Sequence, residues 1–134
     1  MKKIILTLLV AFVGFNANAQ IKTPQPSTSQ KIEQAVGLSN ITLEYSRPNM
    51  NGRTIFGDLV PFGKVWRTGA NANTKITFST DVTIDGKNLK KGTYAVFAKP
   101  NQKFWDIFFY SDATNWGAPK TWDETKVALQ TLVN

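Results

Sequence analysis

Residues 93–110 read TYAVFAKPNQKFWDIFFY and hold two apolar runs separated by a turn at Pro100 and Asn101. The first run, residues 93–98, is apolar at nearly every position, and so is the second, residues 104–110, apart from Asp106. Strands that are buried on both faces have this composition, whereas a strand with one solvated face alternates. The two runs therefore predict the centre of an antiparallel sheet.

The neighbouring segments show the alternation that is typical of strands with one solvated face. Residues 41–46 (ITLEYS) and 75–80 (KITFST) place apolar and polar side chains at alternate positions. Residues 82–84 and 87–89 flank Asp85-Gly86, a pair that accepts the two positive φ angles of a type I′ hairpin turn. Lys91 and Gly92 predict a further turn before the first central strand.

Two segments fit either a strand or a helix. Residues 29–36 (SQKIEQAV) form a helical stripe or a strand that ends at the following glycine, and in the strand case residues 38–40 are the hairpin turn. Residues 123–134 form a helix capped by Asp123 or a strand whose alternate residues from Val127 are apolar or β-branched. We favour the strand for this second segment.

Short strands at close spacing, joined by Gly, Pro and Asn turns, predict an all-β fold. We expect an antiparallel β-sandwich or a partly open barrel with one long ordered loop. Residues 29–134 are predicted to form a single domain of ordinary size. Residues 20–28 (QIKTPQPST) are rich in proline and small polar residues, so they predict an extended tether before the domain.

The first nineteen residues show the three parts of a secretory signal peptide. Lys2 and Lys3 form the positive start, residues 4–15 (IILTLLVAFVGF) form a short apolar stretch, and Ala17-Asn18-Ala19 forms a small-residue cleavage site. We expect cleavage between Ala19 and Gln20 and a periplasmic or extracellular protein. The chain has no cysteine, so we expect no lipid anchor on a cysteine.

The absence of histidine and cysteine excludes several chemistries. Ser-His-Asp and Cys-His nucleophile systems cannot form, nor can ordinary zinc sites with His and Cys ligands. The acidic residues do not show the spacing of a calcium-binding loop, so we expect no metal and no cofactor.

The basic residues do not indicate a nucleic-acid partner. The chain has 16 Lys and Arg against 9 Asp and Glu, and loss of Lys2 and Lys3 with the signal peptide leaves 14 basic residues, a net charge of 14 − 9 = +5. The lysines are scattered, whereas nucleic-acid-binding surfaces gather them in a stripe. We therefore expect no nucleic-acid partner, and no membrane anchor in the mature chain.

Residues 47–73 (RPNMNGRTIFGDLVPFGKVWRTGANAN) are the longest stretch without a strand or helix pattern, and loops of this length in compact domains are often functional. Their many apolar residues indicate an ordered loop, and we expect Phe56, Phe62 and Val65 to pack against the strands. All three arginines of the chain lie in this loop.

The arginines admit two interpretations. Arginine offers a planar fork of donors that binds carboxylate or phosphate with two bonds, which lysine cannot do. In the first interpretation the forks only stabilise the loop, by bonding backbone carbonyls or pairing with Asp58 and Glu44. In the second they face a ligand, and the candidate binding residues are Arg47, Arg53, Trp66, Arg67, Thr68, Asn71 and Trp116. We expect Trp66 to be packed in the core and Trp116, in a turn, to be exposed.

Several short motifs occur in order over nearly the whole mature chain: residues 45–48 (YSRP), 52–57 (GRTIFG), 59–61 (LVP), 65–71 (VWRTGAN), 78–82 (FSTDV), 92–94 (GTY) and 115–117 (NWG). Together they resemble the bacterial family called domain of unknown function 2911, and the WRTGAN stretch is the most specific part. The resemblance implies an exported β-rich envelope protein and supplies no catalytic or binding residues. Family members tend to continue beyond the position of Asn134, which implies further C-terminal strands.

Three classes of function are compatible with these residues. We favour a non-catalytic binding module for an anionic or carbohydrate-type ligand, held by the arginine forks and the tryptophans. The second class is a hydrolase that works through carboxylates, with Glu44 and Asp106 as candidates. The third is a structural or assembly component of the cell envelope that meets a partner chain through Phe104, Phe108 and Tyr110.

Export is expected to remove residues 1–19, because Ala17 and Ala19 suit the small-residue pockets of a signal peptidase. Mass spectrometry of the protein recovered outside the cytoplasm should give a mature chain that starts at Gln20. A recovered chain that still starts at Met1 would contradict the prediction.

Overall fold

Strands account for most of the regular structure in residues 23–134, the part of the chain that the computed structural model describes. They are β1 (Thr28–Val36), β2 (Ser39–Arg47), β3 (Lys75–Phe78), β4 (Val82–Ile84), β5 (Lys87–Leu89), β6 (Gly92–Pro100), β7 (Trp105–Tyr110) and β8 (Val127–Val133). One helical turn, η1 (Glu124–Lys126), precedes β8. The predicted signal peptide, residues 1–19, lies outside the described residues. Within residues 23–134 no helix is long and apolar enough to cross a bilayer.

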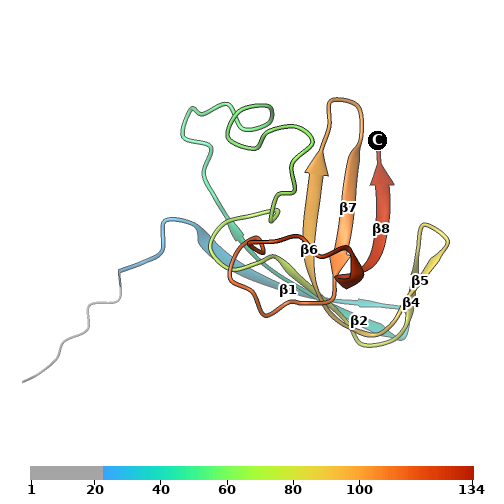
Figure 1. The fold of residues 1–134 in the computed structure, drawn as a ribbon. Coiled ribbons are helices and arrows are strands. Elements are labelled where there is room, and N and C mark those ends of the chain that lie inside the picture. The colour runs from blue at the N-terminus through green and yellow to red at the C-terminus, as the bar shows by residue number, and fades with distance from the viewer. Residues whose placement is uncertain (1–22) are drawn as a thin grey trace, which may run out of the picture.

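The strands form one large antiparallel sheet and one small hairpin. The six-stranded sheet has the order β1-β2-β3-β6-β7-β8, and β4 pairs with β5 in a separate two-stranded sheet. In Figure 1, β6, β7 and β8 stand upright, β1 and β2 run across the base, and the β4-β5 hairpin rises at the right. The predicted all-β antiparallel fold is confirmed. The sheet stays open, with β1 and β8 at its two edges.

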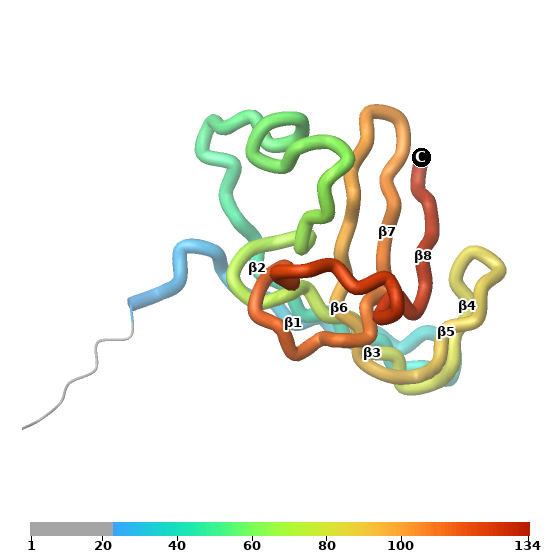
Figure 2. Tube along the Cα trace, in the orientation of Figure 1, coloured from blue at the N-terminus to red at the C-terminus, as the bar shows by residue number. Residues whose placement is uncertain are grey.

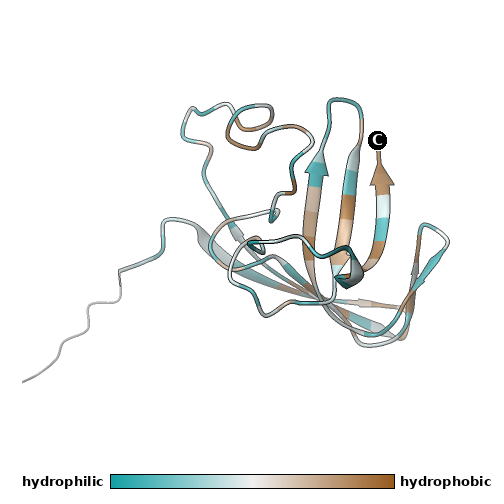
Figure 3. Ribbon diagram, viewed as in Figure 1, coloured by the Kyte–Doolittle hydropathy of each residue, from teal (hydrophilic) through white to brown (hydrophobic). Residues whose placement is uncertain are grey.

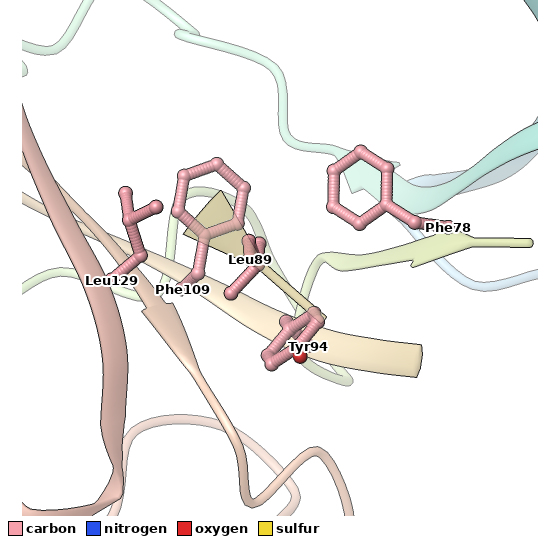
Figure 4. Packing of buried hydrophobic residues seen from close by; sticks show 5 residues of the cluster. All are labelled: Phe78, Leu89, Tyr94, Phe109 and Leu129. Atoms are coloured by element: carbon pink, nitrogen blue, oxygen red, sulfur yellow. The ribbon is translucent and has the colours of Figure 1, made fainter. Parts of the chain in front are cut away.

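The β4-β5 hairpin covers one face of the sheet. Leu89 of β5 packs with residues from four strands of the large sheet, and Figure 4 shows this cluster, whose members are Phe78, Leu89, Tyr94, Phe109 and Leu129. Each is at most 8% exposed. Burial of a side chain of this size contributes about 1.5–3 kcal/mol. The small hairpin therefore acts as the second layer of a sandwich over this half of the sheet.

Trp122 covers the opposite face. It makes edge contacts with Phe97 and Phe108 of the central strands, with ring centroids 5.5 and 5.2 Å away, and a tilted contact with Tyr110 at 4.8 Å. Trp122 belongs to residues 111–123, the connection that leads from β7 to η1. Both faces of β6 and β7 are therefore buried, as their apolar runs predict. The hydropathy colours in Figure 3 are brown in the middle of β7 and at the two ends of β8, and teal at the tip of the β4-β5 hairpin.

Both ambiguous segments are strands over most of their length, and Asp123 caps only the single helical turn η1. Residues 29–36 belong to β1, which starts one residue earlier at Thr28, and residues 127–133 form β8. The hairpin turn predicted at residues 38–40 is wrong, because Val36 pairs with Ser39 and the turn is Gly37-Leu38. Gly37 has a φ of 60°, which fits the first central position of a type II′ turn, where glycine avoids a steric penalty.

The other turns agree with prediction more closely. Asp85 and Gly86 both have positive φ, 50° and 74°, as a type I′ turn requires. The turn expected at Pro100 and Asn101 lies slightly later. Pro100 still pairs with Trp105 in the sheet, and the amide of Asn101 donates to the carbonyl of Phe104 at 3.0 Å. Phe104 consequently sits in the loop, 39% exposed, rather than at the start of β7.

The loop of residues 47–73 packs beside β6, where Figure 2 shows it as a folded green lobe. Val65 packs against the cluster around Phe97, and Phe56 contacts Trp105 of β7 with ring centroids 4.7 Å apart. Phe62 is 41% exposed, and its ring lies against Gly57 of the same loop. The expectation that the loop packs on the strands therefore holds for Val65 and Phe56 and only weakly for Phe62.

Hydrogen exchange should divide this loop into a slow part and a fast part. The amides of Trp66 and Val60 are expected to exchange slowly, since they donate to Ala98 at 2.7 Å and to Ile55 at 2.8 Å. The exposed stretch at Met50 and Asn51 should exchange rapidly. Residue-resolved exchange by NMR measures both, and uniformly fast exchange over residues 47–73 would show that the loop is not ordered in solution.

Candidate functional site

The candidate site forms beside β6, which pairs with β3 along its first half and with a loop segment along its second half. β3 pairs with β6 only as far as Lys75 opposite Ala95. Beyond that point the segment of residues 66–74 takes its place: the amide of Val96 donates to Thr74 at 2.8 Å. Trp66 and Ala98 exchange both backbone hydrogen bonds, at 2.7 and 2.9 Å. The WRTGAN motif therefore supplies the missing partner of the second half of β6.

Thr68 completes this irregular ladder with its side chain. Its φ is 54°, a value that a β-branched residue rarely adopts. The hydroxyl donates to the carbonyl of Val96 at 2.7 Å, and the carbonyl of Thr68 accepts from the hydroxyl of Thr74 at 3.0 Å. The predicted ligand-binding residue Thr68 is therefore engaged in holding the loop on β6.

Asn71 and Gly69 hold the same loop against the start of the domain. Asn71 also has positive φ, 59°, and its side-chain amide donates to the carbonyl of Ser27 at 3.3 Å. A Cβ at Gly69 would lie 3.2 Å from the carbonyl oxygen of Ser46, so the close approach of the two backbones favours glycine. This part of the motif holds the loop against β2 and against Ser27, the residue before β1.

The three arginines have different surroundings. Arg53 donates from Nε to Met50 at 3.0 Å and from Nη2 to Asn49 at 2.7 Å, which closes a turn of the loop. This is the backbone-binding role that the structural interpretation predicts. Arg47 is exposed at the end of β2 and does not line the pocket described next. Within residues 23–134, no arginine forms an ion pair with Asp58 or Glu44.

A pocket of about 630 Å³ lies between the long loop and Ala118. One wall is apolar and comes mainly from the loop, with Met50, Ile55, Leu59, Val65 and Trp66. The charged lining residues are Arg53 and Arg67. Its volume is in the range of small-molecule sites, and its charge has one sign only. The arrangement suits a ligand with an anionic group and an apolar part.

Arg67 connects the pocket with Trp116. Its guanidinium carbon lies 5.7 Å from the centre of the Trp116 ring, within reach of a cation–π interaction. The Nε donates weakly to Gly69 at 3.4 Å, and within residues 23–134 the two terminal NH2 groups have no hydrogen-bond acceptor. A Cβ at Gly117 would lie 2.9 Å from Nη1 of Arg67, so glycine leaves room for the guanidinium. In the described part of the chain, Arg67 therefore lies beside Gly69 and Trp116 with terminal donors that have no acceptor.

Of the predicted site residues, the structure gathers Arg53, Trp66 and Arg67 in the pocket lining and places Trp116 beside Arg67. Trp116 is 73% exposed, as its position in a turn predicts. Trp66 is half-buried and makes edge contacts with Phe56 and Trp105, at 5.9 and 6.3 Å. Its role combines core packing with a pocket wall.

A second hollow of about 810 Å³ adjoins the first at Ala118, which lines both, and Trp116 lines this second hollow. Its carboxylates are engaged in local bonds: Asp112 accepts from Lys126 at 2.8 Å, and Glu124 accepts from the indole N–H of Trp122 at 2.9 Å. The hydrogen bond from Lys126, with those from Thr114, holds the pKa of Asp112 well below its usual range. A carboxylate that stays ionised is not poised as a general acid.

The structure keeps the two predicted carboxylates apart. Glu44 lies exposed on β2, whereas Asp106 is 8% exposed on β7, and these strands are not neighbours in the sheet. Asp106 accepts from Gln130 at 2.9 Å and lies 3.5 Å from the ammonium of Lys99. Within residues 23–134 no group of three acidic residues is arranged to hold a metal ion.

The face proposed for a partner chain is covered by the protein itself. Phe108 and Tyr110, 4% and 1% exposed, pack under Trp122. Phe104 lies in the loop before β7 and does not extend this face. Within the described residues, the connection that follows β7 folds back over this face, so Phe108 and Tyr110 are not exposed for contact with a partner chain.

Sequence reasoning did not identify the apolar wall of the pocket as part of a site. Met50 and Leu59 remain 61% and 54% exposed rather than buried under the loop. An exposed apolar residue in a loop looks the same in sequence as a buried one, so composition alone carries no signal for this wall.

The sequence analysis also did not single out Asn73, which is 3% exposed. Its side-chain amide has no hydrogen-bond partner within residues 23–134.

Two replacements of Thr68 distinguish the contribution of its hydroxyl to stability from the contribution of its shape. Thr68→Val is expected to lower the free energy of unfolding by about 1–3 kcal/mol, because the carbonyl of Val96 loses its donor. Thr68→Ser keeps the hydroxyl and should stay within about 0.5 kcal/mol of the parent protein. Urea unfolding of both variants gives the comparison, and equal losses would show that the hydroxyl does not stabilise the loop.

Comparison with known proteins gives one family. A model of the family described as "Protein of unknown function (DUF2911)" matches residues 27–134, which include every described strand. No curated protein and no solved structure matches the chain. The resemblance noted in the sequence is thereby confirmed, and the chain belongs to the DUF2911 family.

Proposed function

We propose that this protein is an exported, non-catalytic binding protein whose pocket beside Arg67 takes a small organic anion. One observation carries the proposal: the pocket of about 630 Å³ has charged lining residues of one sign only, Arg53 and Arg67. Opposite charge is the simplest source of selectivity in a pocket that is otherwise largely apolar.

Arg67 is the residue that should bind the anionic group. Its Nε is engaged only by a 3.4 Å contact with Gly69, so the fork can donate to a carboxylate or phosphate with two parallel bonds. The ring of Trp116, 5.7 Å from the guanidinium carbon, restricts the Arg67 side chain, which lowers the conformational entropy lost on binding. Arg53 contributes positive charge, while two of its donors remain on the loop backbone.

The apolar wall should make the pocket prefer anions that carry a non-polar part. Met50, Leu59 and Trp66 offer surface to the non-polar part of a ligand, which inorganic phosphate lacks. The exposed ring of Trp116 next to Arg67 could also receive the apolar face of a sugar. We therefore expect acidic sugars or peptide carboxylates to bind better than inorganic phosphate.

Two further points support this function over a hydrolase. The pocket lining contains no carboxylate, so it holds no acid or base for hydrolysis. The predicted signal peptide would deliver the protein to the periplasm or the exterior, where acidic sugars and peptide fragments of the envelope occur.

Arg67→Lys tests the proposal, because it keeps the charge and removes the planar fork. Mature protein is screened by thermal shift against acidic oligosaccharides, short peptides and phosphates, and the hits are measured by calorimetry. Arg67→Lys should weaken binding of a hit by about 1.5–3 kcal/mol, roughly 10- to 150-fold, while the melting temperature of the free protein changes little.

Arg47→Lys is the matched control, since Arg47 belongs to the same loop but does not line the pocket. It should bind the same ligand as the parent protein does. Equal weakening by both substitutions would assign binding to general positive charge. A screen without any hit, or a loss confined to the melting temperature of Arg67→Lys, would overturn the proposed site and leave Arg67 a structural residue.

A further inference from the structure

The edge strand β1 is long, regular and uncovered. It pairs with β2 over nine residues without a bulge, and no other strand within residues 23–134 lies on its second side. Eight of its nine residues are exposed. Natural sheets usually protect such an edge with proline, a bulge, a covering segment or charged side chains, and of these β1 has only the charged pair Lys31 and Glu33.

The opposite edge of the sheet is treated differently. β8 carries a register shift opposite Phe109 and Tyr110, and the β4-β5 hairpin reaches its backbone. The ammonium of Lys87 donates to the carbonyl of Gln130 at 2.7 Å, and Asp85 accepts from the hydroxyl of Thr131 at 2.9 Å. Only β1 therefore presents an unobstructed edge in the described part of the chain.

The geometry of the hairpin determines which backbone groups of β1 point outward. In a two-residue hairpin the residues that flank the turn bond each other, so Val36 and every second residue before it bond β2. The residues between them, at positions 29, 31, 33 and 35, direct their N–H and C=O away from the sheet. The carbonyl of Ala35 agrees with this, since it accepts the side-chain amide of Gln34 at 2.9 Å.

The sequence of β1 is self-complementary about Ile32. Residues 30–34 read QKIEQ, with Lys31 and Glu33 at equal distances on either side. If two copies of β1 run antiparallel about a two-fold axis at Ile32, each Lys31 lies opposite Glu33 of the other copy. This register also places outward-pointing backbone groups opposite one another, as an antiparallel ladder requires. Opposite charges directly across two strands stabilise their pairing.

The same register buries apolar surface. Ile32 is 38% exposed and lies on the face of the sheet that carries Leu43 and Ile76, its neighbours in register. At the two-fold axis the Ile32 side chains of the two copies would meet in a pair without hydrogen bonds, where strands approach most closely. Charge and apolar contact therefore favour one and the same alignment.

We infer that two copies of this protein associate through antiparallel pairing of β1 about Ile32, which joins their sheets into one continuous sheet. The occupant of the edge is a second copy rather than an unrelated strand, because the complementary charges are supplied by β1 itself. A symmetric contact of this kind closes on itself and leads to a dimer and not to a fibre. A single pair of strands is a small interface, so the dimer should dissociate on dilution.

Charge exchange tests the register. Glu33→Lys and Lys31→Glu each place like charges across the proposed axis and should weaken the dimer roughly tenfold or more. The double variant Lys31→Glu/Glu33→Lys restores opposite charges and should dimerise as the parent does. An equimolar mixture of the two single variants should form a heterodimer, although each alone is monomeric.

Sedimentation of the mature protein over a micromolar to millimolar range measures each state. Lys31 and Glu33 also form an ion pair with each other at 2.6 Å, and Lys31 lies opposite Glu44 of β2, so the single variants change charge contacts within the monomer as well. Because both side chains are well exposed, 56% and 67%, these contacts contribute little and the folded monomer should tolerate the substitutions, which circular dichroism and the unfolding midpoint verify. Ala35→Pro provides a second route, since it removes an outward N–H without any change of charge and should also yield monomers.

A parent protein that is monomeric at every concentration would overturn the inference. So would a dimer that withstands both single charge variants and Ala35→Pro, because its interface would then lie elsewhere. Single variants that fail to associate when mixed would rule out the register about Ile32. The monomeric variants should bind the ligand of the pocket as the parent protein does, since β1 lies outside the pocket lining. Dimer formation and ligand binding can therefore fail separately.

Discussion

The structure depends on the pairing of the WRTGAN segment with the second half of β6. β3 is only four residues long, so without this segment the central strand would leave its backbone groups from Val96 to Ala98 without partners. Trp66, Thr68 and Thr74 supply those partners, two through the backbone and one through a hydroxyl. The constraint explains the positive φ of Thr68, because the chain must turn while it stays bound to β6.

This pairing also positions the pocket. Once Trp66 is bonded to Ala98, the preceding residues must fold back beside the sheet, and Phe56 packs against Trp66 and Trp105. The following residue, Arg67, then lies next to the connection that carries Trp116. The same connection supplies Trp122 to the core, so the outer wall of the site is anchored through the packing of the central strands. Stability and recognition share one set of contacts.

The two proposals use what this arrangement leaves uncovered. Within the described chain, the β4-β5 hairpin and Trp122 cover the two faces of the central strands, but nothing lies over the apolar wall around Met50 and Leu59. Nor does anything cover the outer edge of β1. The pocket and the edge are built from different segments, so ligand binding and self-association can be tested separately.

The sequence by itself determined the strands, since residues 93–98 and 104–110 are apolar on both faces and Asp85-Gly86 tolerates positive φ. It could not decide residues 29–36, because Ile32 and Val36 fit a helix as well as a strand; the exposed edge strand forms because β2 pairs with it. It also identified the arginine loop but not the different roles within it. Arg53 bonds its own loop, whereas Arg67 lies within cation–π distance of Trp116, 49 positions away, and only tertiary packing brings such distant residues together.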